Sequence, residues 1–355
     1  MNKQPYTIKS LPAYICSVDG MTRNWKYFAG LLPGVLVLAG NLYGGWMTLA
    51  NAAFILVFLG IAEWFMGEDH DNAHSAAADS LPELLLVLHA VLHGLCLLTF
   101  FYGINQGILQ GAWIWTAALS LGIHGGSSAI VIAHELIHKK ENGKQWIGRL
   151  LLASTGNFYF HVHHLRIHHR WVGTAHDAAT ARKGESVYGF FVRSIVQQIR
   201  QAAESEDKRL KGKFLSWENE MLRPLFIHAL ILGLAVAFSG LIGLLAYGFS
   251  CFMSCFLLEY VNYIEHYGLQ RAEDEKVTPE HSWSTDKTVS RYLLIDLSRH
   301  ADHHAFPSRP YHTLRSYSDA PTLPGGYAGL VIPALIPPLW YALVHPRIDA
   351  LQHAH

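Results

Sequence analysis

Long apolar runs that alternate with polar segments organise this chain. An α-helix needs about 20 apolar residues to cross the roughly 30 Å apolar core of a bilayer. Six runs reach that length, at residues 26–44, 47–66, 83–104, 112–133, 225–246 and 247–265. The pattern therefore predicts an all-α polytopic membrane protein with six transmembrane helices.

The basic residues are distributed unevenly between these runs. Of the 27 Lys and Arg, four precede residue 27, fifteen lie from Lys139 to Arg223, and eight follow from Arg271 onward. Because basic residues close to membrane spans remain on the cytoplasmic side, both termini are predicted to be cytoplasmic. The polar segments 134–224 and 266–355 should then form a cytoplasmic helical cap, and residues 1–355 a single membrane-bound domain.

Composition agrees with a membrane protein. The chain is 51% hydrophobic and 15% charged, and its 27 acidic residues balance its 27 basic ones, so nothing suggests a nucleic-acid partner. The first 25 residues are polar and contain Pro5 and Pro12, which argues against a removable signal peptide. The cysteines form no CxxC pair and are expected to be small core residues, namely Cys16, Cys96, Cys251 and Cys255.

Two further details bear on the membrane part. Gly122 and Gly126 have the small-xxx-small spacing that lets helices pack closely or leaves room for a ligand. The last apolar run, Tyr327 to Val344, is interrupted by three prolines. It is therefore expected to lie against the membrane face or to re-enter it, and not to span as a straight helix.

Histidine is the unusual residue, with 23 in the chain. On an α-helix, side chains three or four residues apart share a face, so His134 with His138 and His164 with His168 should each present two imidazoles to one point. His300, His303 and His304 repeat this spacing. The predicted metal ligands are His134, His138, His164, His168, His169, His266, His300, His303 and His304.

The number of histidines limits the kind of metal site. Nine imidazoles suffice for two ions that keep open coordination positions. Imidazole binds iron, copper, nickel and zinc, so the ligand type alone does not identify the metal. Open positions on a redox metal favour dioxygen chemistry, and iron is therefore the expected metal. His134-Glu135-Leu136-Ile137-His138 also fits the HExxH motif of zinc proteases, in which the glutamate is the general base. A single zinc ion, however, cannot use the other clusters.

Neutral imidazoles leave the charge of the metal ions uncompensated, so carboxylates that accept ring N–H groups are expected nearby. Glu259, Asn262 and His266 share a helical face, and a glutamate inside an apolar run needs a functional reason. The candidates for this supporting role are Glu135, Asp177, Glu259, Asn262, Glu265 and Asp302.

With these motifs in view, the chain resembles the membrane-bound alkane 1-monooxygenase family, within the integral-membrane fatty acid desaturase and hydroxylase superfamily. The resemblance runs from about residue 25 to 345. It is carried by Gly67-Glu68-Asp69, His134-Glu135-Leu136 with His138-Lys139-Lys140, His164 to His169, Asn262-Tyr263-Ile264-Glu265-His266-Tyr267-Gly268-Leu269, His281-Ser282-Trp283 and Arg299-His300-Ala301-Asp302-His303-His304.

The resemblance implies a non-haem di-iron centre held by the nine histidines, with dioxygen as co-substrate. It implies hydroxylation of the terminal carbon of medium- or long-chain n-alkanes in the bacterial inner membrane, with the active site facing the cytoplasm. Electrons would come from rubredoxin and its reductase, with NADH as the ultimate donor. Without CxxC pairs rubredoxin is not fused here, and an acidic carrier could dock on a predicted surface helix that carries Arg193, Arg200, Lys208, Arg209 and Lys211.

Three departures from the family pattern leave the substrate open: Trp171 after Arg170, the pair Ala175-His176, and Ser284. A related enzyme acting on fatty acids, as a hydroxylase, desaturase or oxidative decarboxylase giving terminal alkenes, would have the same ligands. No Lys or Arg lies in the apolar runs beyond Lys26, which favours an uncharged substrate. Chain length should depend on bulky side chains of the second run, such as Phe54, Ile55 and Phe58.

Overall fold

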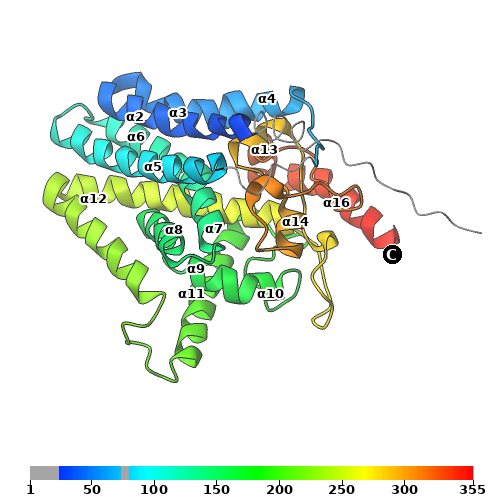
Figure 1. Ribbon diagram of the computed structural model, residues 1–355. Coiled ribbons are helices and arrows are strands. Elements are labelled where there is room, and N and C mark those ends of the chain that lie inside the picture. Colours follow the sequence, from blue (N-terminus) through cyan, green and yellow to red (C-terminus); the bar gives the residue numbers. More distant parts are fainter. Residues whose placement is uncertain (1–23, 73–79, 355) are drawn as a thin grey trace, which may run out of the picture.

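The computed structural model describes residues 24–72 and 80–354, and every regular element in this part of the chain is helical (Figure 1). The all-α prediction is therefore confirmed for the described residues. The expectations about a signal peptide and about Cys16 concern residues outside the described part. Cys96, Cys251 and Cys255 are free thiols, as their apolar surroundings predicted.

Within residues 24–72 and 80–354, four helical segments are long and apolar enough to cross a membrane, at Gly45–Phe65, Leu81–Asn105, Ala112–Ile137 and Leu222–His266. The first consists of η2 (Gly45–Leu49), α3 (Ala50–Ala53), η3 (Phe54–Leu59) and α4 (Gly60–Phe65), and the second is α5. The third consists of α6 (Ala112–His124), η4 (Gly125–Ala129) and α7 (Ile130–Ile137), and the fourth is α12. The predicted run at 26–44 is also helical, as η1 (Tyr27–Leu31) and α2 (Leu32–Tyr43), and it packs beside α5.

The last two predicted runs form a single bent helix, α12. The sequence placed their junction between residues 246 and 247, but the helix bends at Gly240, where φ is 64° and ψ is −163°. Glycine adopts positive φ without the steric penalty that a Cβ atom brings, so the bend falls on this residue. The two limbs of α12 diverge as a V in Figure 1.

The third span packs closely against α12 through small residues, which is one of the two uses that their spacing predicted. A Cβ atom on Gly122 would lie 2.6 Å from the Cβ of Met253, and one on Gly126 would lie 2.6 Å from the Cβ of Leu257. Neither contact leaves room for a side chain, so these glycines fix the approach of the two helices.

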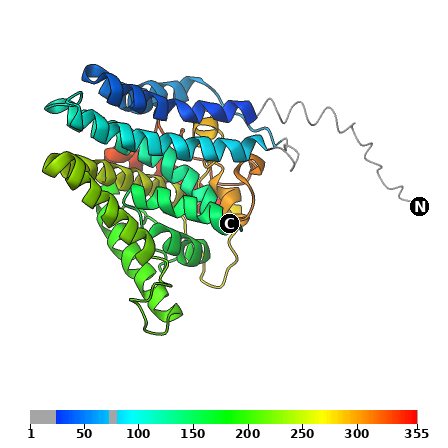
Figure 2. The same ribbon diagram turned by 60° about the vertical axis from the view of Figure 1, so that its left-hand side comes forward.

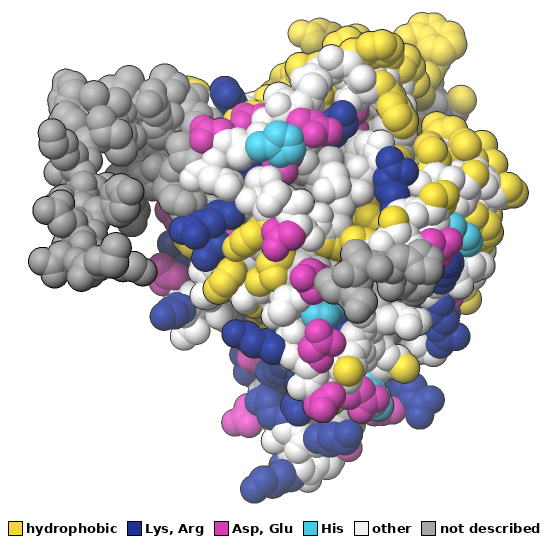
Figure 3. Space-filling view, turned by 90° about the vertical axis from the view of Figure 1, so that its right-hand side faces the viewer, with side chains coloured by type: hydrophobic (Ala, Val, Ile, Leu, Met, Phe, Trp, Pro, Cys, Tyr) yellow, Lys and Arg dark blue, Asp and Glu magenta, His cyan; other side chains and the backbone are white. Residues whose placement is uncertain are grey.

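The outer surface of the spans is apolar. Phe65 is 82% exposed, Trp46 79% and Leu98 67%, which is expected only where lipid covers the side chains. Figure 3 shows hydrophobic side chains along the upper edge of one face and charged side chains mainly over its lower part. The chain is a membrane protein with a polar portion outside the apolar belt.

The polar portion is built from two segments. The first contains α8 (Asn142–Ser154), α9 (Phe160–His163), η5 (His164–His168), α10 (His169–Trp171) and α11 (Val187–Arg209). The second contains η6 (Pro279–His281), α13 (Thr288–Leu293), α14 (His300–Ala305), η7 (Tyr311–Thr313), α15 (Val331–Leu335) and α16 (Pro337–Ala354). Two of the three prolines in the last apolar run stand at the start of α16, a position that proline tolerates.

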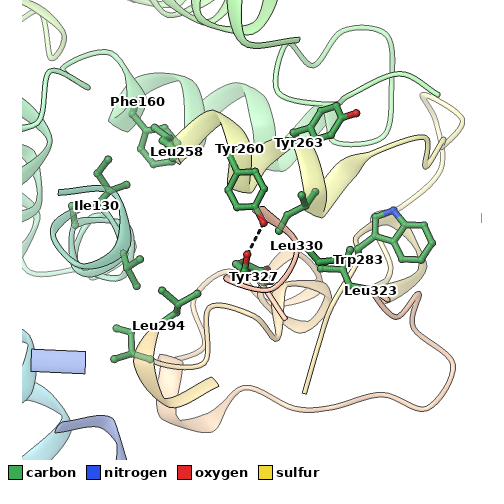
Figure 4. Packing of buried hydrophobic residues seen from close by; sticks show 14 of the residues in the cluster. Ile130, Phe160, Leu258, Tyr260, Tyr263, Trp283, Leu294, Leu323, Tyr327 and Leu330 are labelled. Carbon is green, nitrogen blue, oxygen red and sulfur yellow. Dashed lines mark hydrogen bonds between the residues drawn. The ribbon is translucent and has the colours of Figure 1, made fainter. Parts of the chain in front are cut away.

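The largest hydrophobic core lies where the third span, α12 and the C-terminal segment meet. Its aromatic residues carry polar groups that find partners inside it. Tyr260 of α12 donates a hydrogen bond of 2.6 Å to the carbonyl oxygen of Tyr327 (Figure 4). This contact ties the C-terminal segment to the end of α12 that bears His266. Figure 2 shows the compact arrangement of the spans from a second direction.

Candidate metal centre

Histidines from widely separated parts of the chain come together in two adjacent groups. In each group the nearest ring nitrogens all lie within 4.8 Å of one another. The five-histidine group consists of His134, His138, His164, His169 and His303. The four-histidine group consists of His168, His266, His300 and His304. The groups adjoin at His169 and His304, whose ring centroids are 4.6 Å apart. The structure thus gathers all nine histidines that the sequence singled out.

Two of the histidine pairs follow the α-helical spacing. His134 and His138, at the end of α7, both belong to the five-histidine group. On α14, His300 and His304 belong to the four-histidine group, with their Nε2 atoms 2.9 Å apart. His303 lies between them in sequence and points to the other group, because it is on a different part of the helix circumference.

The third pair is arranged differently from its prediction. His164 and His168 belong to different groups, so the prediction that they present their rings to one point was wrong. The reason is that η5 is a π-helical turn, in which the backbone hydrogen bonds reach the fifth residue. The wider turn places His164 beside His169, with their Nε2 atoms 3.0 Å apart, and directs His168 to the four-histidine group.

The spacing of the ring nitrogens fits a bound cation. The Nε2 atoms of His138, His164 and His169 form a triangle with edges of 3.0, 3.0 and 3.2 Å. In a neutral imidazole Nε2 is either a hydrogen-bond donor or an acceptor. Among three Nε2 atoms at least two must therefore be of the same kind, and those two cannot form a hydrogen bond with each other. A metal ion accepts all three lone pairs, and bonds of about 2.0–2.1 Å put neighbouring ligands about 3 Å apart.

Unpartnered nitrogens and low pKa values support the same conclusion. Nε2 of His134 and Nε2 of His168 are buried and have no hydrogen-bond partner among the described residues. Burial, helped by neighbouring histidines, lowers the pKa of His138 to about 3 and holds the pKa values of His303 and His304 well below their usual range. These three imidazoles are therefore neutral at pH 7 and can offer lone pairs to a metal.

Two buried carboxylates stand next to ligands of the four-histidine group. Asp177 Oδ2 lies 2.9 Å from Nδ1 of His168, so it accepts the ring N–H and leaves Nε2 facing the group. Glu265 Oε2 lies 3.2 Å from Nε2 of His300, and its other oxygen accepts a hydrogen bond of 2.6 Å from the Tyr327 hydroxyl. Both carboxylates would offset the positive charge of a bound metal.

Two other predicted carboxylates are paired with cations instead. Glu135 accepts from the Lys139 ammonium at 2.8 Å, and Asp302 accepts from Arg309 at 2.5 Å and from the Tyr317 hydroxyl at 2.7 Å. These contacts anchor the segments around the histidines. Because Lys139 holds Glu135, the glutamate of the HExxH motif is not placed as the general base of a zinc protease.

Glu259 and Asn262 lie on the face of α12 toward α11 and the histidines. Glu259 is fully buried and accepts from the amide of Gln198 at 2.7 Å, which accounts for a carboxylate inside an apolar helix. The amide of Asn262 lies 3.5 Å from the other oxygen of Glu259. Asn262 also lines the cavity described next, beside His300.

An apolar cavity with two adjoining parts lies between the histidines and the membrane spans. Its inner end is lined by His134 and His164 of the five-histidine group and by His300 of the four-histidine group. Its outer part is lined mainly by apolar side chains, including Ile55, Leu56, Leu257, Val289, Leu293, Leu294, Ala328 and Val331. Gly126, Val131, Val261 and Leu297 line both parts, so the two lie side by side and share these walls. Figure 4 shows Leu258, Tyr260 and Tyr327 on one side of this region and Ile130 and Leu294 on the other.

The three π-helical turns in the described part of the chain all adjoin the cavity or the histidines. Besides η5, these are η3, which contributes Ile55 and Leu56, and η4, which contributes Gly126 and Ser127. Such turns re-aim side chains within a helix and are frequent at functional sites. The turn in η3 also corrects a prediction: Ile55 lines the cavity, whereas Phe58 is 62% exposed toward the lipid side.

Glu63 was missed by the sequence analysis. It lies on α4, is buried, and lines the cavity. Its carboxylate accepts hydrogen bonds from the Ser290 hydroxyl and from the backbone N–H of Gly329, the latter at 2.6 Å. Glu63 is an acidic residue inside the apolar run at 47–66, just as Glu259 is an acidic residue inside a later apolar run. The same criterion could therefore have identified it from the sequence.

Comparisons with known proteins point to one family. A family model described as fatty acid desaturase matches residues 109–334. Alkane 1-monooxygenase 1 of Pseudomonas aeruginosa is 41% identical over 251 residues, which is 67% of this chain and 65% of that protein. Alkane 1-monooxygenase 2 of Alcanivorax borkumensis is 36% identical over 84% of this chain and 82% of that protein. The alkane 1-monooxygenase of Pseudomonas putida is 33% identical over 98% of this chain and 90% of that protein. The match thus spans just under two thirds of the first relative and most of the other two.

Proposed function

Because this chain belongs to the alkane 1-monooxygenases of the fatty acid desaturase family, we propose that it inserts one atom of dioxygen into the terminal C–H bond of medium- or long-chain n-alkanes to give primary alcohols. One observation carries the proposal. The apolar cavity ends at histidines of both groups, so an alkyl chain lying in it would present its end to the metal centre.

Two non-haem iron ions are the proposed occupants of the histidine groups. When bound, they supply the reductive activation of dioxygen, which imidazole-ligated iron with open positions can perform. The nine histidines would hold the ions. Asp177 accepts the Nδ1–H of His168 and so orients that ring, whereas Glu265 lies beside Nε2 of His300 and would offset charge next to the metal. The walls of the cavity position the end of the alkyl chain and exclude water.

The cavity lining favours an uncharged substrate. No Lys or Arg is among the described residues that line it, and Glu63 would repel a carboxylate within it. A fatty acid would have to keep its head group at the mouth, near Arg166 or Arg170. Arg166 is already paired with Glu206 and Glu220, which weakens this alternative.

The membrane arrangement that goes with this function has six crossings, with both termini and the histidines on the cytoplasmic side of the bacterial inner membrane. The length of α12 supports it, because 45 helical residues extend about 68 Å when straight, roughly twice the apolar core of a bilayer. The bend at Gly240 allows its two limbs to cross separately. The whole chain would then act as a single domain.

The proposed electron supply is rubredoxin, reduced by its reductase at the expense of NADH. The proposal is tested by loading the purified protein with Fe(II) in lipid nanodiscs, adding these components, and measuring 1-octanol formed from octane. Lauric acid in place of octane should give little NADH consumption, and a zinc-loaded sample should give no alcohol. Failure to form alcohol from any alkane between roughly eight and sixteen carbons would reject the assignment, since extended chains of this length fit within the apolar core of the bilayer.

Metal analysis of the same preparation provides a second test. We expect close to two iron ions per chain from the two histidine groups. A preparation that holds about one zinc and no iron would instead favour the zinc protease interpretation of the HExxH motif.

A further inference from the structure

The histidines that line the cavity differ from those that are partly exposed. His138 and His169 are the two ligands that are partly exposed, whereas the other seven are buried. Their Nε2 atoms lie 3.2 Å apart, both in the five-histidine group. An electron donor that stays in the aqueous phase comes closest to the centre at these two rings.

The surface beside His169 carries a fixed tryptophan. Trp171 lies two residues after His169, with the Arg170 guanidinium 4.8 Å from its ring centre and the His176 ring 5.0 Å away on another side. The turn is held because Arg271 donates to the carbonyl oxygen of Arg170 at 2.8 Å. Trp171 is only partly buried, so a π-system two residues from a predicted ligand is open to solvent.

An exposed cation that has no carboxylate partner among the described residues follows each of the two partly exposed ligands in the sequence. Within the described part of the chain, Arg170 and Lys140, which follows the His138-Lys139 pair, are both exposed and form no ion pair with a carboxylate. The basic face of α11, which the sequence analysis offered as a docking site, is neutralised in part by its own neighbours. The pairs there are Arg193 with Glu185, Arg200 with Glu204 and Arg209 with Glu206. Lys208 and Lys211 are exposed and form no ion pair among the described residues, but neither follows a predicted ligand.

We propose that the rim formed by Lys140, Arg170 and Trp171 is where the electron carrier docks, and that Trp171 is the point at which electrons enter. The carrier is a small protein with an acidic face around a one-electron centre, because the rim offers uncompensated cations and an aromatic ring. In each transfer the reduced carrier loses one electron and the metal centre gains one, and no bond forms or breaks. This inference rests on the proposed function, since it requires a redox-active metal.

Binding tests the docking site without relying on turnover. Rubredoxin is titrated onto the protein in nanodiscs of zwitterionic lipid. Arg170→Glu should weaken binding about tenfold or more at low ionic strength, and the effect should shrink at high salt because exposed charges are then screened. The control is Arg200→Glu, which makes the same change of charge on α11 and should alter the affinity less than about twofold. Equal effects of the two variants would place the docking site elsewhere.

Electron transfer tests the role of Trp171. In stopped-flow experiments with iron-loaded protein and saturating reduced rubredoxin, Trp171→Leu should slow metal reduction about tenfold or more, whereas Trp171→Phe should retain most of the rate. Reduction by dithionite should be the same in both variants and in the unsubstituted protein. An unchanged rate with rubredoxin in Trp171→Leu would overturn the entry role. Failure of the proposed function would appear differently, as the absence of reducible metal in the unsubstituted protein, and the binding measurement would still decide the docking site.

Discussion

The two histidine groups are similar in size but differ in their surroundings. Asp177 and Glu265 stand beside ring nitrogens of the four-histidine group, and all four of its histidines are buried. Among the described residues, no carboxylate lies within ion-pair distance of the five-histidine group, two of whose rings are partly exposed. The comparison indicates that one group receives charge compensation while the other provides access from solvent.

The difference follows from where each group sits. A metal ion that is enclosed by protein is poorly solvated, so nearby carboxylates must take over part of the compensation that water would provide. The five-histidine group has an additional neutral ligand and contact with solvent. We therefore expect the two groups to respond differently to the loss of a single ligand or carboxylate.

The largest effect should come from removing a ligand. His266→Ala leaves the four-histidine group with three imidazoles, so about one metal ion per chain should be lost and alcohol formation should fall at least about 100-fold. His169→Ala leaves the five-histidine group with four imidazoles and should retain most of its metal. Metal per chain, measured by mass spectrometry, checks this. His70→Ala, whose side chain is 63% exposed and outside both groups, is the control. Equal metal loss from both ligand variants would contradict the comparison.

A smaller effect should follow from the carboxylate of the four-histidine group. Burial raises the pKa of Asp177, but the neighbouring His168 and the hydrogen bonds that the carboxylate accepts outweigh this and lower the pKa below its usual range. Asp177→Asn removes the charge that orients His168 and should weaken metal binding about 10- to 100-fold. The matched control is Glu135→Gln, because Glu135 pairs with Lys139. Chelator competition should show weakening only in Asp177→Asn.

The hydroxyl that supports Glu265 should matter less again. Tyr327→Phe removes a hydrogen bond of 2.6 Å to a buried carboxylate, at a cost of about 1–3 kcal/mol in unfolding free energy. We expect a lower thermal midpoint, full metal content and slower turnover. Tyr260→Phe removes a hydrogen bond of the same length to the backbone carbonyl of Tyr327. It should lower the midpoint while leaving turnover nearly unchanged, and a similar loss of turnover in both variants would contradict a role for Glu265.

The smallest effect on the metal groups should come from the far end of the cavity. Leu56→Ala lengthens or widens the cavity and should shift the preference toward longer alkanes by a few-fold, because each methylene buried adds about 0.8 kcal/mol. Metal content should not change. Val57→Ala, at an adjacent residue that is 57% exposed, should leave the ratio of hexadecane to octane turnover as it is. A shift in both variants would argue against the assigned path.

Much of this molecule follows from local patterns that a sequence displays. The apolar runs marked the helices, because an element surrounded by lipid must be continuously apolar. The spacing of His134 with His138 and of His300 with His304 predicted shared faces, since both pairs lie on ordinary α-helix. The glycine spacing at Gly122 likewise predicted a close helix contact.

Other features were decided only when the helices packed together. His164 and His168 are four residues apart, so their spacing predicts an ordinary α-helix and gives no sign of the π-helical turn η5 that directs them to different groups. The bend of α12 at Gly240 lies inside an unbroken apolar run, so the sequence pattern does not reveal it. Glu135 and Asp177 were equal candidates for supporting a metal ligand, because both are close to histidines in the sequence. In the structure Glu135 pairs with Lys139, whereas Asp177 accepts the ring N–H of His168. Periodicity reports the geometry of one helix at a time, whereas the partner of a charged side chain and the wall of a cavity depend on which distant segments meet.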